Sequence, residues 1–229
     1  MSPTGDPRSD APEPPMGVPL PERVAEVLRE AILNGGFNPG DALTEAQLAA
    51  ELRVSRAPIR EALRILAGEG LVEVVPYKGT TVRKISRKDI EEVYSLRGQL
   101  ETFALERLIT AETPVDLLPL ERLCARMQAL AAEGDFAKLS AEDEAFHRTM
   151  IALTGHELLA QVWDSLAIRL RFIIAMRNRH NDDAMEVALN HVPIVEAIRR
   201  RDLDEARTII ARHVRSAADL IAWVEDGTA

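Results

Sequence analysis

The stretch that decides the fold runs from Leu43 to Leu63 and reads LTEAQLAAELRVSRAPIREAL. Its apolar residues recur every three or four positions in two blocks, a spacing that predicts two short helices joined by a tight turn. Ser55 is a residue type that favours the N-cap position, and Pro58 falls in the first turn of the second helix, where Pro is well tolerated. These features predict a helix-turn-helix.

The second helix of this pair carries three arginines at intervals of four, Arg56, Arg60 and Arg64, which places them on one exposed stripe. A guanidinium group can bond both major-groove acceptors of guanine, so the stripe indicates binding to double-stranded DNA. The alternative is the solvated face of an ordinary helical hairpin. We favour DNA binding because the turn, the cap and the stripe agree, and we count Ser55 among the candidate DNA contacts.

Sequence on both sides of the pair extends this module. Two runs rich in β-branched residues, 71–75 and 80–83, are separated by PYKG, which predicts a hairpin. A helix-turn-helix followed by a hairpin is a winged helix. Lys78 and Gly79 at the tip are expected to reach backbone phosphate or the minor groove. Residues 21–33 have helical spacing and predict the supporting first helix.

Composition divides the chain into three parts: a disordered tail at 1–17, the winged helix at 18–85 and a second domain at 86–229. The formal charge of −9 is uneven, because residues 21–88 hold 11 Lys and Arg against 9 Asp and Glu. The acidity therefore lies outside the DNA-binding module. Such weak basicity predicts modest non-specific affinity for DNA, so that two modules must act together in a homodimer.

From residue 86 onward helical periodicity dominates and no strand pattern is evident, which predicts an all-helical bundle and a mainly α fold. The expected helices are 87–109, 114–133, 139–153, 157–179, 184–200 and 203–225. No run is long and apolar enough to span a membrane, and the first residues do not form a signal peptide, so we expect a cytoplasmic protein. The single cysteine, Cys124, is expected to be a core thiol.

Inside the bundle, Asp143 and His147 lie four residues apart and so share one helix face, while His191 and His213 fall on the last two helices. Three imidazoles and a carboxylate suit Zn²⁺ or Ni²⁺, and the lack of cysteine ligands argues against a closed structural zinc site. Taken alone this is a weak signal, because separate helix histidines are more often core or surface residues.

The first module resembles the GntR family of bacterial transcription regulators. The shared pattern is LA, then VSRAPIREAL, then EGL, followed by Gly79 and Val82. The resemblance implies that Arg56 and Arg60 contact bases and that Gly79 sits at the wing tip. Two positions depart from the pattern: Ala46 stands where some relatives have a basic residue, and Arg53 stands where Gly is usual.

The second domain is similar to the FCD effector domain of the FadR subfamily, through EDEAFH at 142–147, NHVPIVEAI at 190–198 and ARH at 211–213. In metal-containing members the ligands match Asp143, His147, His191 and His213. The resemblance also places Arg97 at a position that often faces the ligand cavity; an intrahelical pair with Glu101 is an equal alternative.

These observations predict a metabolite-responsive transcription regulator, a repressor, and not an enzyme. It would bind a palindromic operator as a dimer and sense a small carboxylate or hydroxy acid at the metal, with Arg97 pairing to the acid's charge. One alternative is a metal-dependent enzyme with an accessory winged helix, whose general base would be Glu142, Glu144 or Glu196. The other is a DNA-binding dimer whose metal site is purely structural.

Overall fold

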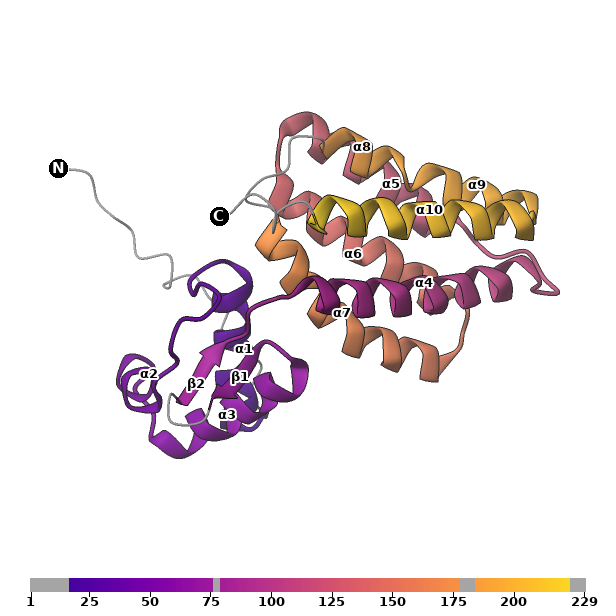
Figure 1. Cartoon of the computed structure of the whole chain (residues 1–229). Coiled ribbons are helices and arrows are strands. Elements are labelled where there is room, and N and C mark those ends of the chain that lie inside the picture. Colours follow the sequence, from indigo (N-terminus) through magenta and orange to yellow (C-terminus); the bar gives the residue numbers. More distant parts are fainter. Residues whose placement is uncertain (1–16, 76–78, 178–183, 223–229) are drawn as a thin grey trace. The chain divides into compact units, whose positions relative to one another are not determined.

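The computed structural model describes residues 17–75, 79–177 and 184–222, which form two compact units (Figure 1). One unit ends at Ile85 and the other begins at Ser86. The described residues are mostly helical, with one small antiparallel sheet in the first unit, which confirms the mainly α prediction with an N-terminal winged helix-turn-helix and a C-terminal helical domain.

The first unit is built on a three-helix core with a hairpin at its edge. Its elements are α1 (Leu20–Leu33), α2 (Glu45–Glu51), α3 (Arg56–Glu69), β1 (Val72–Val75) and β2 (Gly79–Val82). Helix α1 packs against α3, and β1 pairs antiparallel with β2 so that Val72 lies opposite Val82. The buried apolar side chains come from every one of these elements: Val24, Leu28, Ile32, Leu48, Ile59, Leu63, Leu66, Leu71, Val72 and Val82. Lys78, expected at the wing tip, lies outside the described residues.

The turn between α2 and α3 explains one departure from the family pattern. Arg53 has φ = 54°, a left-handed conformation that Gly adopts without steric cost. Ser55 stands at the N-cap of α3 with extended backbone, as expected, but its hydroxyl makes no hydrogen bond to the helix, so the expected side-chain cap is absent. The start of α3 is therefore set by backbone geometry and by Pro58 in its first turn.

The second unit is a helical bundle. Its described helices are α4 (Arg87–Ile109), α5 (Leu118–Glu133), α6 (Phe136–Leu153), α7 (Glu157–Arg177), α8 (Ala184–Leu189), α9 (Val192–Arg200) and α10 (Leu203–Ala222). Helix α4 begins at a capping box, in which Ser86 and Asp89 each bond the other's backbone N–H. It packs against α6, α7 and α10, and with them forms the walls of the site described below.

One predicted helix is wrong. The range 184–200 was expected to be continuous, but α8 ends at Leu189 and α9 begins at Val192. Pro193 is the cause, because it has no N–H to donate and its ring would clash with the carbonyl four residues earlier. His191 consequently lies at a joint between two helices, where its backbone takes the N-cap position of α9.

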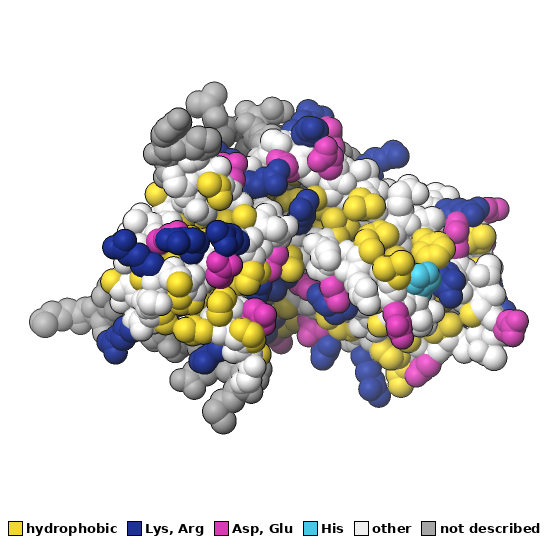
Figure 2. Space-filling view, turned by 90° about the horizontal axis from the view of Figure 1, so that it is seen from below, with side chains coloured by type: hydrophobic (Ala, Val, Ile, Leu, Met, Phe, Trp, Pro, Cys, Tyr) yellow, Lys and Arg dark blue, Asp and Glu magenta, His cyan; other side chains and the backbone are white. Residues whose placement is uncertain are grey.

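The surface of the second unit carries exposed apolar side chains on two packed helices, Leu96 and Phe103 on α4 and Leu158 and Val162 on α7. Figure 2 shows hydrophobic side chains gathered over one face of this unit. We refer to Leu96, Phe103, Leu158 and Val162 together as the α4–α7 apolar surface.

Cys124 is buried in α5, as expected. Within the described part of the chain, none of the helices has the length and apolar character needed to cross a membrane.

Candidate functional site

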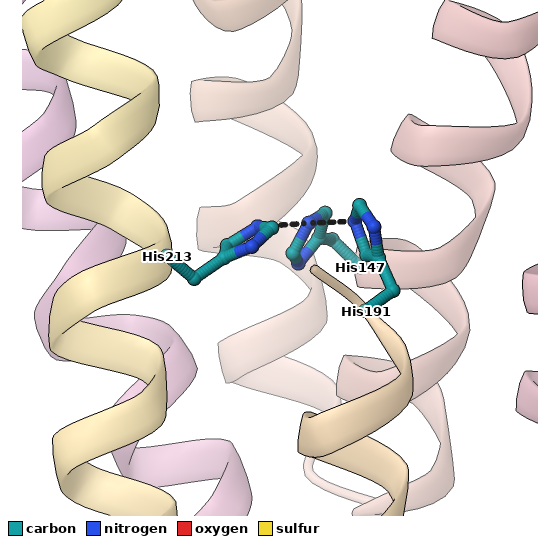
Figure 3. Close-up of side chains that lie close together, drawn as sticks. All are labelled: His147, His191 and His213. Atoms are coloured by element: carbon teal, nitrogen blue, oxygen red, sulfur yellow. Dashed lines mark hydrogen bonds between the residues drawn. The ribbon is translucent and has the colours of Figure 1, made fainter. Parts of the chain in front are cut away.

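Three histidines from three separate parts of the second unit meet in its interior. His147 comes from α6, His191 from the joint between α8 and α9, and His213 from α10, and their rings point toward one another (Figure 3). The Nε2 atom of His147 lies 3.2 Å from Nε2 of His191 and 3.2 Å from Nε2 of His213. All three side chains are buried.

Asp143 completes the cluster. It lies one turn before His147 on α6, and its Oδ1 atom is 3.0 Å from Nε2 of His191. The four residues that the resemblance singled out as metal ligands are thus neighbours in the structure, although 70 residues of sequence separate the first from the last.

The outer ring nitrogens fix which atoms face inward. Nδ1 of His191 lies 2.9 Å from the carbonyl oxygen of Val187 and must donate to it, because a carbonyl can only accept. Nδ1 of His147 lies 3.1 Å from Oε1 of Glu101. In neutral rings these contacts place the proton on Nδ1 and leave the lone pair of Nε2 pointing at the centre, an arrangement typical of metal-ligating histidines.

The donor set fits a borderline divalent cation. Nitrogens bound to one ion at about 2.1 Å would be roughly 3.0–3.4 Å apart, and the two separations from Nε2 of His147, both 3.2 Å, fall in that range. The ligand atoms of the three histidines lie within 4.8 Å of one another, and an oxygen of Asp143 lies beside one of them; lone pairs this close are unfavourable unless a proton or a cation lies among them. Imidazole and carboxylate ligands suit Zn²⁺ and Ni²⁺ alike.

Arg97 of α4 reaches the same centre. Its Nε donates to Oε1 of Glu101 at 2.6 Å, and its Nη2 lies 2.6 Å from Nε2 of His147 and 3.4 Å from Nε2 of His213. Its guanidinium also stands over the ring of Tyr94. Arg97 therefore makes the predicted pair with Glu101 and also faces the cluster, while its contact with an effector stays a prediction.

Burial and charge act in opposite directions on these groups. Burial would raise the pKa of Glu101, but the positive charge of Arg97 outweighs burial and lowers this pKa to about 2. Burial likewise opposes ionisation of Asp143, yet its contact with His191 and the positive charge of Arg97 hold its pKa well below the usual range. Burial lowers the pKa of His147 and that of His213, which keeps both imidazoles neutral and able to bind a metal.

A cavity of about 20 Å³ adjoins the cluster, and Arg97, Asp143, His147, Trp163 and Arg171 contribute to its walls. The indole N–H of Trp163 is buried and has no hydrogen-bond partner among the described residues. Sequence reasoning missed Trp163 and Arg171. Periodicity could mark Trp163 as buried, but nothing in its spacing indicates that it lines a cavity.

The glutamates considered as general bases are all engaged in ion pairs. Glu142 pairs with Arg126 at 2.7 Å, Glu144 pairs with Arg148 at 2.8 Å, and Glu196 pairs with Arg199. Among them, Glu144 also lines the cavity. These contacts provide no carboxylate poised as a general base at the cluster.

In the first unit, the three arginines of α3 are all exposed, as the stripe predicted. Arg60 is held by Glu45 of α2 through two contacts of 2.9 Å, and Arg64 pairs with Glu61 at 2.7 Å. Gly79 opens β2 with φ = 84°, a conformation that favours glycine.

Comparison with known proteins bears on both units. The model described as "Bacterial regulatory proteins, gntR family" matches residues 20–82, and the model described as "FCD domain" matches residues 92–216. The gluconate operon transcriptional repressor of Bacillus licheniformis is 33% identical over 187 residues, covering 80% of this chain and 76% of that protein. The Nta operon transcriptional regulator of Aminobacter aminovorans is 29% identical over 195 residues, 83% of this chain and 89% of that protein.

Solved structures agree at the level of the fold. McbR/YncC of E. coli superposes with a TM-score of 0.75 at 22% identity, covering 91% of this chain and 99% of that one. A transcriptional regulator GntR from Rhodococcus sp. RHA1 gives a TM-score of 0.73 at 25% identity, covering 88% of this chain and 97% of that one. The first likeness shows the arrangement of the chain and nothing about its ligands.

Proposed function

Because this chain belongs to the GntR family of bacterial regulatory proteins and carries an FCD domain, we propose that it is a repressor that releases a palindromic operator when a small carboxylate or hydroxy acid binds at a metal in its second unit. The chain is a DNA-binding transcription regulator, and the proteins it matches are regulators, not enzymes. The operator, the dimer, the metal and the effector are the parts that we propose.

The DNA contact rests on α3. Its exposed arginines are spaced to face one groove, and we assign base contacts to Arg56 and Arg60 and a supporting contact to Arg64. The exposed Ser55 at the start of the helix and the wing residues Lys78 and Gly79 would contact the phosphate backbone or the minor groove. Repression is supported by the relative in B. licheniformis, which is named as a repressor of the gluconate operon.

The effector site rests on one observation: three buried histidines, one of them in contact with Asp143, cluster beside a cavity that a buried arginine lines. Asp143, His147, His191 and His213 would hold the metal, Zn²⁺ or Ni²⁺, which would supply open coordination positions for an acid. Glu101 would orient His147 from behind, and Arg97 would pair with the carboxylate of the bound acid.

The dimer is supported by the α4–α7 apolar surface. Leu158 is 63% exposed, and Leu96, Phe103 and Val162 are 39–46% exposed; exposed apolar side chains gathered on two packed helices are typical of a surface that a partner covers. We propose that a second copy covers this surface. Two-fold pairing would present two copies of α3, which is why the operator is expected to be palindromic.

The test is operator binding measured by fluorescence anisotropy, with a panel of small carboxylates and hydroxy acids, in Zn²⁺ and again in EDTA. We expect at least one acid to weaken operator binding in Zn²⁺ and to have no effect in EDTA. If no acid changes operator binding or thermal stability, while Zn²⁺ alone raises the melting temperature, the metal is structural. Consumption of an acid by the protein would instead support the enzyme alternative.

A further inference from the structure

The contact between Arg97 and His147 uses the atom that a metal ion would need. A neutral imidazole has one acceptor nitrogen, and in His147 this is Nε2, because Nδ1 faces the carboxylate of Glu101. Nη2 of Arg97 donates to that same Nε2 at 2.6 Å and lies 3.4 Å from Nε2 of His213. One lone pair cannot serve a guanidinium N–H and a divalent cation together.

We propose that Arg97 is a built-in competitor of the metal: its guanidinium fills the inner face of His147 when the ion is absent, and metal loading turns it toward the adjoining cavity, where it binds the carboxylate of the effector. This inference rests on the metal and effector sites of the proposed function. It adds an order of events, in which the metal prepares the arginine and the arginine then receives the acid.

The charges around Arg97 make both positions tenable. In the position seen here, the guanidinium lies near the carboxylates of Glu101 and Asp143, and it donates to the ring nitrogens of His147 and His213, whose lone pairs would otherwise face each other. A divalent ion at the histidines would place two further positive charges beside it. Coulomb repulsion then favours movement away from His147, while the bond from Nε to Glu101, on the same helix, can act as the pivot.

The adjoining cavity is where the guanidinium would move and where it would bind the effector. At about 20 Å³ it has room for about one water molecule, which is less than a carboxylic acid needs, and Arg97 forms part of its wall. Turning the guanidinium away from His147 would rearrange this wall and expose N–H groups to an entering anion. Two further residues line this cavity and offer N–H donors: Trp163, whose indole N–H has no partner among the described residues, and Arg171, which pairs with Glu144 at 3.3 Å.

The first test compares Zn²⁺ affinity, measured against a fluorescent chelator, in the wild type and in Arg97→Met/Glu101→Gln. The double variant removes one positive and one negative charge, so the net charge at the site is unchanged, and the glutamine oxygen can still accept from Nδ1 of His147. Loss of the competing hydrogen bond should tighten Zn²⁺ binding about 10- to 100-fold. The matched control is Arg171→Met, which removes a cation from the cavity wall but no contact with His147; it should change Zn²⁺ affinity less than about threefold.

An equal or weaker Zn²⁺ affinity in the double variant overturns the proposal, and so does equal tightening in Arg171→Met, because that change breaks no contact with His147. Should the double variant fail to fold, NMR of the wild type gives an independent answer. The side-chain N–H signals of Arg97 should be protected from exchange without metal and should shift as Zn²⁺ is added, reaching their end point at one ion per chain. Signals that do not move at full Zn²⁺ occupancy contradict the proposal.

The outcome is distinguishable from failure of the proposed function itself. If neither the wild type nor the double variant binds Zn²⁺, the proposed metal site is wrong. The proposal that Arg97 competes with the metal is then wrong too. If both bind and the affinities differ as expected, yet no acid affects operator binding, then Arg97 competes with the metal while the effector site is wrong.

Discussion

The guanidinium of Arg60 on α3 forms a two-pronged ion pair with the carboxylate of Glu45 on α2, with both contacts at 2.9 Å. Two parallel N–H donors are also what guanine requires in the major groove, so Glu45 occupies the donors that would read a base. The pair lowers the pKa of Glu45 and keeps its carboxylate charged. Arg56 forms no ion pair within the described part of the chain. DNA would therefore have to displace Glu45 in order to reach Arg60, whereas it would displace no carboxylate from Arg56.

We expect Arg56→Ala and Arg60→Ala each to weaken binding to the specific operator about 5- to 150-fold, because each removes a bidentate base contact. Binding to random DNA should weaken much less, and Lys78→Ala should weaken both kinds of binding with a shallower salt dependence. Fluorescence anisotropy on operator and scrambled duplexes gives the ratio of specific to non-specific affinity for each variant. Equal losses on the two duplexes would remove the base-reading role.

Glu45→Gln should strengthen binding to random DNA and reduce the preference for operator. The change removes a negative charge near the phosphates and releases Arg60 to bond phosphate as well as base. The slope of log K against log salt should steepen by up to about one. Glu51→Gln on the same helix is the matched control, because it changes net charge equally but touches Gln47 and no arginine of α3. If the two variants behave alike, Glu45 acts through charge alone.

Much of the fold was predictable because its signals are local. The apolar spacing of α1 to α3, the β-branched runs of the hairpin and the helical periodicity beyond Ser86 each depend on neighbours within a few residues. The split between α8 and α9 was missed although Pro193 was visible, since a proline inside a long helical pattern can kink a helix without ending it. The unused hydroxyl of Ser55 was not predictable, because cap propensity does not fix a side-chain rotamer.

The site was predictable only in part. Spacing linked Asp143 to His147, but resemblance alone joined them to His191 and His213, because contacts between distant helices leave no mark in one sequence. The contact from Glu101 to His147 was missed for the same reason. Arg97 and Glu101 at i and i+4 predicted their mutual pair correctly, yet that spacing could not indicate that the pair is buried against a cluster of histidines.

His191→Ala or His213→Ala should lower metal occupancy at least tenfold, because each removes one of the three clustered histidines among the four proposed ligands. The purified wild type should hold about one divalent ion per chain, measured by mass spectrometry of the metal content. His156→Ala is the matched control, since this histidine lies outside the cluster and its Nδ1 accepts from the backbone N–H of Leu159. Full occupancy in both ligand variants would show that other residues bind the metal.

Without metal, the unfolding free energy should fall as pH drops below about 6.5. Burial lowers the pKa of His147 and of His213, so the unfolded chain takes up protons there at a pH where the folded chain does not. Each histidine can contribute up to about 1.4 kcal/mol per pH unit in this range. Glu101, with a pKa of about 2, and Asp143 add their own losses only below about pH 4.5, the ordinary range of carboxyl groups. Urea unfolding in EDTA at pH 8, 6.5 and 5 measures the slope, and His147→Gln/His213→Gln should flatten it; a slope unchanged in that variant would assign it elsewhere.

Stripping the metal should abolish the response to effector while leaving effector-free operator binding within about threefold of its original value. The reason is that the DNA-reading helix has a core of its own, built from Ile59, Leu63 and Leu66 with partners in the first unit, and does not need the metal in order to fold. An allosteric coupling of about 1–3 kcal/mol would make the metal-loaded protein lose operator affinity about 5- to 150-fold when the acid binds. The measurement is operator anisotropy in EDTA and in Zn²⁺, with and without the acid, alongside the sedimentation behaviour of the free protein. If EDTA alone destroys operator binding and the dimer dissociates, the metal holds the dimer together. The metal site is then structural, and the proposal that it senses an effector is wrong.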